Sequence, residues 1–161
     1  MLITQPLVDA INAEIGRELE SSNQYLAIAT FMEEKALRLL AKLFYEQSDE
    51  ERTHALKFVH YLSDVGGEVR IPPIPAPDTE FDTVEAAVKH ALDWELTVTR
   101  HINDLMALAI SERDYAAQDF LRWFVTEQIE EVRKMEDLLK ITKAVGERNI
   151  AMVEAYLAHK E

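Results

Sequence analysis

The strongest constraint on this chain is a set of four long segments in which apolar residues recur at alternating spacings of three and four. That spacing places side chains along one face of an α-helix, so each segment predicts an amphipathic helix. The four stripes are Leu7, Ile11, Ile15, Glu18, Ser22, Tyr25, Ala29 and Met32; Leu37, Leu40, Phe44, Gln47, Glu51, His54, Phe58, Tyr61 and Val65; Val84, Val88, Ala91, Glu95, Val98, Ile102, Leu105 and Ala109; and Ala117, Leu121, Phe124, Gln128, Glu131, Met135, Leu138, Thr142 and Val145. Four such helices predict a bundle with a shared core.

Each stripe is interrupted near its middle by residues that an apolar core does not favour. They are Glu18, then Glu51 with His54, then Glu95, then Gln128 with Glu131. Burying one carboxylate is costly, and several close together resist ionising at the same time. A cation is therefore expected among them. Arginine or lysine partners are the alternative to a metal, but neither residue type lies on the four stripes, and we interpret the set as a site for a pair of metal ions.

The composition favours a single all-α domain over residues 1–161 and excludes several functions. The net charge of −13 argues against nucleic acid as a partner, because phosphate binding needs clustered Lys and Arg. Cysteine is absent, so disulfides, thiolate metal sites and thiol nucleophiles are excluded. No apolar run approaches the ~20 residues that span a bilayer, and no leader sequence is expected. We therefore expect a cytoplasmic protein without a membrane partner.

Breaks in the pattern predict helices at about 5–34, 37–65, 82–111, 115–145 and 147–159, with Thr4, Asp82 and Asp114 as N-terminal caps. Residues 66–81 contain four prolines and cannot continue a helix. In an extended polyproline conformation this segment could reach ~40 Å, the length of the neighbouring helices. It predicts a long crossover that makes the second and third helices parallel. The short fifth helix predicts docking against another subunit.

The ligand types indicate the class of metal. Glu51 and His54 are three residues apart and share a helix face. Carboxylate oxygen and imidazole nitrogen suit iron, and they also accept manganese or zinc. A carboxylate has two oxygens, so Glu51 can bridge two ions. The Glu-x-x-His motif alone is weak evidence, but its combination with acids on the three other stripes is specific.

The chain resembles the non-haem bacterial and archaeal ferritins over nearly its whole length. The resemblance is carried by the segments EIGRELESSNQY (14–25), DEERTHA (49–55), ELTVT (95–99) and FLRWFVTEQIEE (120–131). It implies a ferritin-like four-helix bundle with a long crossover between the second and third helices and a short fifth helix. It also implies a homo-oligomeric hollow shell, usually of 24 subunits, which oxidises Fe(II) with dioxygen or peroxide and stores the ferric mineral.

The same resemblance implies roles for particular residues. Glu18, Glu51 and His54 would hold the first iron. The second iron would be held by Glu51, Glu95 and Glu131, with Gln128 beside it. A third iron site would map to Glu50, Glu127, Glu130 and Glu131. Tyr25 resembles the tyrosine that hydrogen-bonds or donates an electron at the family's centre, and the fifth helix resembles the one that lines the shell's four-fold axes.

This sequence differs from related iron-binding families at particular residues, and these differences narrow down which family it resembles. The bacterioferritins use a methionine just after the glutamate of the second helix as a haem ligand, and this chain has Arg52 there, so no haem is expected. They also have a histidine three residues after the position of Gln128, where this chain has Glu131. Rubrerythrin-like peroxidases add a cysteine-bound iron, which the absence of cysteine excludes.

Alternatives stay open at two residues and for the function. Gln128 is either a direct ligand or a hydrogen-bond donor to a ligand, and Tyr25 is either a packed aromatic or a redox participant. The third site competes with an ordinary solvated acidic face. A bundle oxidase or peroxidase that acts on a small substrate without storing iron is a second hypothesis, and a scaffolding shell that no longer binds iron is a third.

The remaining chemically notable residues have simpler interpretations. Trp94 and Trp123 are expected in the core. The other histidines are expected at the surface, and they are His60, His90, His101 and His159. The acids near the start of the fourth helix, Glu112, Asp114 and Asp119, are candidates for an ion-entry pore.

Overall fold

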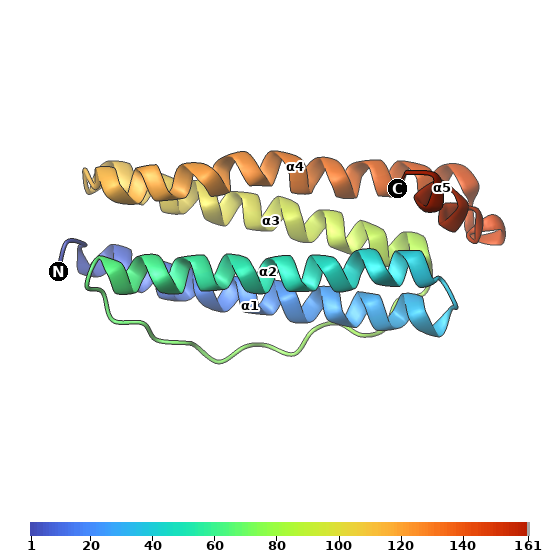
Figure 1. Cartoon of the computed structure of the whole chain (residues 1–161), viewed down its shortest axis with the longest axis horizontal. Helices are drawn as coiled ribbons and strands as arrows, with labels where there is room; N and C mark the ends of the chain where they lie inside the picture. Colours follow the sequence, from blue (N-terminus) through green and yellow to red (C-terminus); the bar gives the residue numbers. More distant parts are fainter. Residues whose placement is uncertain (161) are drawn as a thin grey trace.

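The computed structural model describes residues 1–160, and the expected all-α bundle is confirmed. Four long helices form the bundle: α1 (Gln5–Glu34), α2 (Arg38–Asp64), α3 (Val84–Ser111) and α4 (Tyr115–Val145). Figure 1 shows that α1 and α2 form one antiparallel hairpin and that α3 and α4 form a second, packed against the first. The four polar interruptions of the stripes therefore meet at one level of the bundle.

The long crossover between α2 and α3 runs the length of the first hairpin on its outer side, so α2 and α3 point in the same direction (Figure 1). Two side chains of α1 hold it. Asn12 donates to the carbonyl oxygen of Glu68 at 2.8 Å and accepts from the backbone N–H of Arg70 at 2.7 Å. Gln24 makes the same pair of bonds with the backbone of Asp78, at 2.9 and 3.0 Å. The proline-rich segment is thereby fixed at two points along α1.

The crossover comes very close to the backbone of α1 at Gly16. A Cβ atom added there would lie 2.4 Å from Cγ of Pro72, well inside van der Waals contact. Glycine is needed at this position because any side chain would push the crossover away from α1.

The apolar core is divided into two halves by the polar level. One half gathers side chains such as Ile28, Met32, Phe44, Val88 and Met135. The other gathers Leu7, Ile11, Phe58, Ile102 and Leu121. Because both halves are closely packed, the polar residues between them are held by rigid helices rather than by loops.

Two of the three expected helix caps differ in the structure. Asp114 caps α4 as expected, accepting from the backbone N–H of Ala117 at 2.9 Å. At α3 the cap is Thr83, and not Asp82, because α3 begins one residue after Thr83. The hydroxyl of Thr4 makes no capping bond at α1, because Pro6 occupies the first turn and removes one of the N–H groups that a cap would satisfy.

The segment expected as one helix over 147–159 is divided into two elements. A 3-10 turn, η1 (Glu147–Asn149), precedes a short helix, α5 (Met152–Lys160). Gly146 adopts φ 73°, a left-handed conformation that ends α4 and lets the chain turn.

The C-terminal segment packs on its own bundle through α5 and through two glutamates. Val153 is fully buried, and Leu157 packs against the same core half. Glu154 accepts from the backbone N–H groups of Leu39 and Leu40 at the start of α2, at 2.9 and 3.0 Å. Glu147 accepts from the N–H of Val84, the first residue of α3, at 2.8 Å. The docking of this segment against another subunit stays a prediction.

None of the helices within residues 1–160 is both long and apolar enough to cross a membrane.

Candidate metal centre

Six side chains from all four helices meet between the two core halves, and each is at most 5% exposed. They are Glu18 from α1, Glu51 and His54 from α2, Glu95 from α3, and Gln128 and Glu131 from α4. Each lies on an apolar stripe, so the helix packing that buries the stripe also brings these side chains together.

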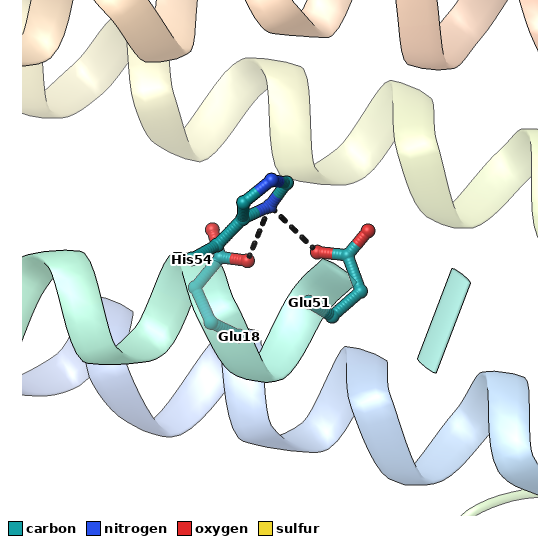
Figure 2. Close-up of side chains that lie close together, drawn as sticks. All are labelled: Glu18, Glu51 and His54. Atoms are coloured by element: carbon teal, nitrogen blue, oxygen red, sulfur yellow. Dashed lines mark hydrogen bonds and ion pairs between the residues drawn. The ribbon is translucent and has the colours of Figure 1, made fainter. Parts of the chain in front are cut away.

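The first group of potential ligands lies within the α1–α2 hairpin and consists of Glu18, Glu51 and His54. Their ligand atoms lie within 4.8 Å of one another. Nδ1 of His54 is 3.2 Å from Oε2 of Glu51 and 3.6 Å from Oε2 of Glu18, and Figure 2 shows the imidazole between the two carboxylates. Oε2 of Glu18 is buried and has no hydrogen-bond partner. A cation bound between these groups would supply the missing partner.

The electrostatics of this group follow from burial and from the single imidazole. Burial raises the pKa of Glu18 well above its usual range, and the charges of Glu51 and Glu14 raise it further. Burial also raises the pKa of Glu51, but the hydrogen bond and charge of His54 outweigh it, so the pKa is lowered overall. The pKa of His54 is raised, because the bond to Glu51 and the carboxylate's charge outweigh burial, which lowers it.

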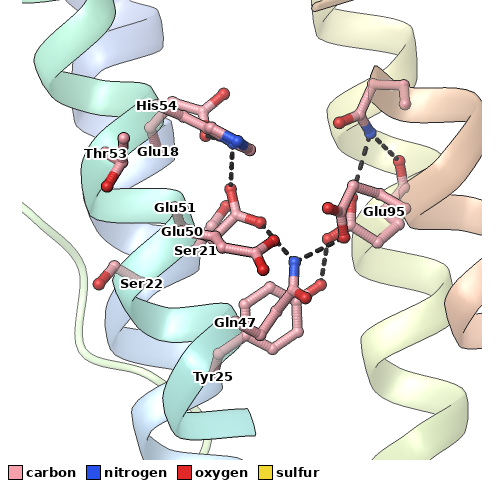
Figure 3. A network of polar contacts seen from close by, with 12 residues as sticks. Glu18, Ser21, Ser22, Tyr25, Gln47, Glu50, Glu51, Thr53, His54 and Glu95 are labelled. Atoms are coloured by element: carbon pink, nitrogen blue, oxygen red, sulfur yellow. Dashed lines mark hydrogen bonds and ion pairs between the residues drawn. The ribbon is translucent and has the colours of Figure 1, made fainter. Parts of the chain in front are cut away.

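The second group spans the two hairpins and consists of Glu51, Glu95 and Glu131, again within 4.8 Å. The amide of Gln47 lies against it, donating to Oε1 of Glu51 at 3.0 Å and to Oε2 of Glu131 at 2.6 Å. Figure 3 shows this amide beside Glu51 and facing the second hairpin. Glu51 belongs to both groups, and a shared carboxylate is what a bridge between two metal ions requires.

Glu95 is surrounded by hydrogen-bond donors. The hydroxyl of Tyr25 donates to its Oε1, and the two residues face each other in Figure 3. Nε2 of Gln128 donates to its Oε2 at 3.1 Å and to the hydroxyl of Thr99 at 3.1 Å. Burial and the charge of Glu51 raise the pKa of Glu95 to about 8, although the bond from Tyr25 lowers it.

The phenol of Tyr25 is fully buried, and burial with the charges of Glu95 and Glu51 raises its pKa well above the usual range. It therefore stays protonated and acts as a donor. Gln128 likewise appears in the structure as a donor to Glu95, while its role as a direct ligand stays a hypothesis.

A third group, Glu50, Glu127 and Glu131, lies where the centre opens to the α2–α4 face, again within 4.8 Å. It lines a cleft of about 440 Å³, which has room for a hydrated cation. Glu130 lines the same cleft but is exposed, and its carboxylate is not brought together with the other three. Glu131 connects this group to the second one.

Trp123 packs against His54 at the edge of the same cleft, which both residues line. Trp123 is 42% exposed and contacts the imidazole edge-on at 5.4 Å between ring centroids, so the expectation that it lies in the core is wrong. The ammonium of Lys57 lies 3.1 Å from the Trp123 ring centroid, a cation–π contact. Trp123 lies one position off the α4 stripe, beside the buried Phe124, which places it at the bundle surface.

The remaining residues that were expected either in the core or at the surface vary in exposure. Trp94, expected in the core, is only half-buried and donates to the hydroxyl of Ser21 at 2.7 Å. His60 and His159 are exposed as expected, whereas His90 and His101 are half-buried between α1 and α3. The pore candidates Glu112 and Asp119 are exposed at the α3–α4 turn, and Asp114 is used as the cap of α4.

Three residues of the centre were not identified from the sequence. Gln47 is on the α2 stripe one turn before Glu51, a position that predicts proximity. Glu14 lies one turn before Glu18 and is fully buried, paired with Arg17 at 3.0 Å. Lys134 follows Glu131 by three residues, off the stripe, and its ammonium reaches the carboxylates of Glu131 and Glu50. The spacing to a predicted ligand was the only available signal for each.

Burial raises the pKa of Glu131 to about 7, although the charge of Lys134 lowers it, and neighbouring carboxylates raise it further. With Glu95 at about 8, two carboxyls of the second group hold protons near neutral pH. A divalent cation would displace these protons. An oxygen-rich set with one imidazole and a shared carboxylate can therefore hold two divalent cations of the iron, manganese or zinc type.

Known proteins share both the sequence pattern and the fold. The family model described as the ferritin-like domain matches residues 8–145. Ferritin BfrB of Mycolicibacterium smegmatis is 41% identical over 150 residues, which cover 93% of this chain and 82% of the relative. The bacterial non-heme ferritin of Staphylococcus saprophyticus is 31% identical over 160 residues, covering 99% and 94%. A solved open pore ferritin from the hyperthermophilic archaeon Archaeoglobus fulgidus has a TM-score of 0.94 and 31% identity, covering 97% of this chain and 96% of that one.

Proposed function

The chain belongs to the ferritin family, among the bacterial non-haem ferritins, and from that premise we propose that its buried centre oxidises Fe(II) with dioxygen. The family stores iron, and iron storage is the function of this chain. In this proposal Glu18, Glu51 and His54 hold one Fe(II), and Glu51, Glu95 and Glu131 hold the other. Iron is here a substrate that passes through the centre on its way to storage.

The observation that carries the proposal is the overlap of two ligand groups at one carboxylate. Glu51 contributes to both groups, and each group brings its ligand atoms within 4.8 Å. Two ions bound in this way are held close together by a common bridge, so each can give one electron to the same dioxygen molecule. A site for a single structural ion would not require two overlapping groups.

The residues of the chain supply charge compensation and proton control for this reaction. Four glutamates offset the charge of two divalent ions. Carboxyls that hold protons near neutral pH, Glu95 and Glu131, release them when the cations bind. Tyr25 and Gln128 orient Glu95 through hydrogen bonds, which fixes the ligand before the metal arrives.

Storage of the ferric product implies a shell, and we propose that copies of this chain assemble into a hollow cage, with 24 as the expected number. Large apolar side chains at the surface support contacts between copies. Tyr115 is 77% exposed, Ile129 70% and Met152 60%. Size measurement by light scattering checks this part, and a monomer or dimer would favour the alternative of an oxidase that acts on a small substrate.

The decisive experiment is oxidation of Fe(II) by metal-free protein after an anaerobic titration. We expect saturation at two or three ions per chain and rapid formation of ferric absorbance when dioxygen is added. Glu51→Ala should lower the initial rate by at least ~100-fold, because it removes a ligand from both ions. Glu46→Ala, an exposed acid on the same helix, is the matched control and should oxidise as the unmodified protein does. Oxidation at the unmodified rate in Glu51→Ala would place the reaction elsewhere.

A further inference from the structure

Lys134 is the one lysine within residues 1–160 whose ammonium contacts the carboxylates of the centre. Its Nζ lies 3.4 Å from both carboxylate oxygens of Glu131 and 3.5 Å from Oε2 of Glu50. It also donates to Oε1 of Gln47 at 2.9 Å. The side chain is 35% exposed, so it enters from the cleft on the α2–α4 face rather than from the core.

The contact with Lys134 decides how the Gln47 amide is turned. An ammonium only donates hydrogen bonds, so it must face the oxygen of the amide and not the NH₂ group. The NH₂ group is then directed at Glu51 and Glu131, which it meets at 3.0 and 2.6 Å. Lys134 thus acts on the second ligand group directly, through Glu131, and indirectly, through Gln47.

The same two carboxylates belong to the third ligand group. Glu50 and Glu131, with Glu127, bring oxygens within 4.8 Å of one another at the mouth of the centre. A cation held there would lie against the ammonium of Lys134 and would be repelled by it. The positive charge of Lys134 and that of a third cation are therefore alternative partners for Glu50 and Glu131.

We propose that Lys134 is a built-in competitor of the third cation, which weakens the third site and couples its occupancy to the orientation of Gln47. The inference rests on the proposed function for the identity of the cation and on the contacts of Lys134 for everything else. A third cation must displace the ammonium, and the Gln47 amide then loses the contact that holds its NH₂ group against the second ligand group. Iron at the mouth is consequently held briefly, as suits an ion in transit between the centre and the store.

The test is an anaerobic calorimetric titration of the assembled, metal-free protein, first with Zn²⁺, which is inert to oxidation, and then with Fe(II). Lys134→Met keeps the length of the side chain and removes the charge. We expect its third dissociation constant to fall about tenfold, since a partly buried charge contact is worth on the order of a factor of ten in an equilibrium constant. The step of the group formed by Glu18, Glu51 and His54, whose carboxylates Lys134 does not contact, should change by less than about threefold, and the step of the second group should change less than the third.

Two further variants separate the contact from general charge effects. Lys140 lies on the same helix as Lys134, but its ammonium is 3.7 Å from Asp137 and does not contact the centre. Lys140→Met therefore removes the same unit of charge without touching the centre. It should leave all three dissociation constants unchanged. Lys134→Arg retains the cation and should bind the third ion as weakly as the unmodified protein. An unchanged third constant in Lys134→Met, or an equal change in Lys140→Met, would overturn the inference.

The steps of the isotherm keep this inference apart from the proposed function. The first two steps report the paired centre, and their absence would remove the ferroxidase proposal, whereas a tighter third step in Lys134→Met would still support the role of Lys134. A third step absent from both the unmodified protein and Lys134→Met would overturn that role.

A crystal structure of the unmodified, Zn²⁺-saturated protein is a check that needs no variant. We expect the ammonium displaced from Glu50 and the Gln47 amide rotated, and an unmoved Lys134 beside a bound third ion would contradict the inference.

Discussion

The two halves of the centre stabilise their buried carboxylates in different ways. The half formed by Glu18, Glu51 and His54 lies within one hairpin and contains a group that can itself become cationic, the imidazole. It nevertheless leaves one oxygen of Glu18 without a partner. The half formed by Glu51, Glu95 and Glu131 spans the two hairpins and has no imidazole. Hydrogen-bond donors from Tyr25, Gln47 and Gln128, with the ammonium of Lys134, surround its carboxylates instead.

The difference indicates how the two cations should bind. The histidine half must also release the proton of Glu18, whose pKa burial raises, but one Glu18 oxygen already lacks a hydrogen-bond partner that an ion would have to displace. The acid half has to release protons from Glu95 and Glu131 and loosen the Gln47 amide. We therefore expect the first cation to enter the histidine half and to bind more tightly there.

The largest effect should come from removing a ligand that belongs to one half alone. Glu18→Ala should weaken one cation step by at least ~100-fold and leave the other, and Glu95→Ala should do the reverse, since each removes a direct ligand. Calorimetric titration with Zn²⁺ measures both steps. Loss of both steps in either variant would show that the halves do not bind independently, and the comparison would fail.

A smaller effect is expected for Gln128→Leu, which removes the donor to Glu95 while keeping the side chain's size. A residue that orients a ligand typically changes affinity by about 10- to 100-fold when it is lost. The step assigned to the acid half should weaken within that range, and the histidine-half step should not change. A complete loss of the acid-half step would instead identify Gln128 as a direct ligand.

Tyr25→Phe tests whether the donors of the acid half stabilise the protein before metal binds. Removal of the hydroxyl leaves a buried oxygen of Glu95 without its donor and should lower the free energy of unfolding of the metal-free protein by ~1–3 kcal/mol. Tyr45→Phe removes a hydroxyl that donates to Glu33 at the surface and serves as the control, with little change expected. Denaturant titration gives both values. Unaltered stability together with a loss of oxidation would favour a redox role for Tyr25.

The smallest predicted effect is a dependence of stability on pH. Between the usual glutamate pKa of 4.5 and its own value of about 8, Glu95 in the folded protein keeps a proton that the unfolded chain has released. Stability is therefore present at low pH and is lost as the pH rises through that window. Glu131, at about 7, acts in the same direction.

From pH 5 to pH 8 the melting temperature of metal-free protein should fall, by roughly 3 °C for each kcal/mol of stability that is lost in a chain of this size. Glu95→Gln should flatten the slope, and saturating Zn²⁺ should reverse it because deprotonated carboxyls bind the ion. Melting curves at constant ionic strength measure all three. A melting temperature that rises with pH in the metal-free protein would contradict the raised pKa values.

What could be predicted from the sequence follows the helical period. Glu18, Glu51 and Glu95 lie on the stripes, so the same pattern that predicted the bundle also predicted that they would be buried together. Lys134 could not be found in this way, because it lies off the stripe and reaches the centre through a long side chain whose direction depends on the packing of α2 against α4. Trp123 was misplaced for a similar reason: its apolar character favours burial, but one step around the helix carries it to the surface.

Local signals were reliable only where no second feature competed. Asp114 acts as a cap because nothing else occupies the first turn of α4, whereas Thr4 is followed closely by Pro6, which removes a donor. Leu37 precedes α2 and offers no capping atom, so no local pattern could have predicted that Glu154 supplies one.

That contact has a consequence for the order in which the molecule is completed. Glu154 and Leu39 are 115 residues apart in the chain, and Glu147 and Val84 are 63 apart. During synthesis on the ribosome, the first hairpin emerges long before either glutamate. The backbone N–H groups at the starts of α2 and α3 therefore gain these hydrogen-bond acceptors only when the last part of the chain has been made. A nascent chain interrupted before residue 147 would have all the proposed metal ligands, yet the N–H groups of Leu39, Leu40 and Val84 would lack these partners, a state that quality-control proteases could recognise.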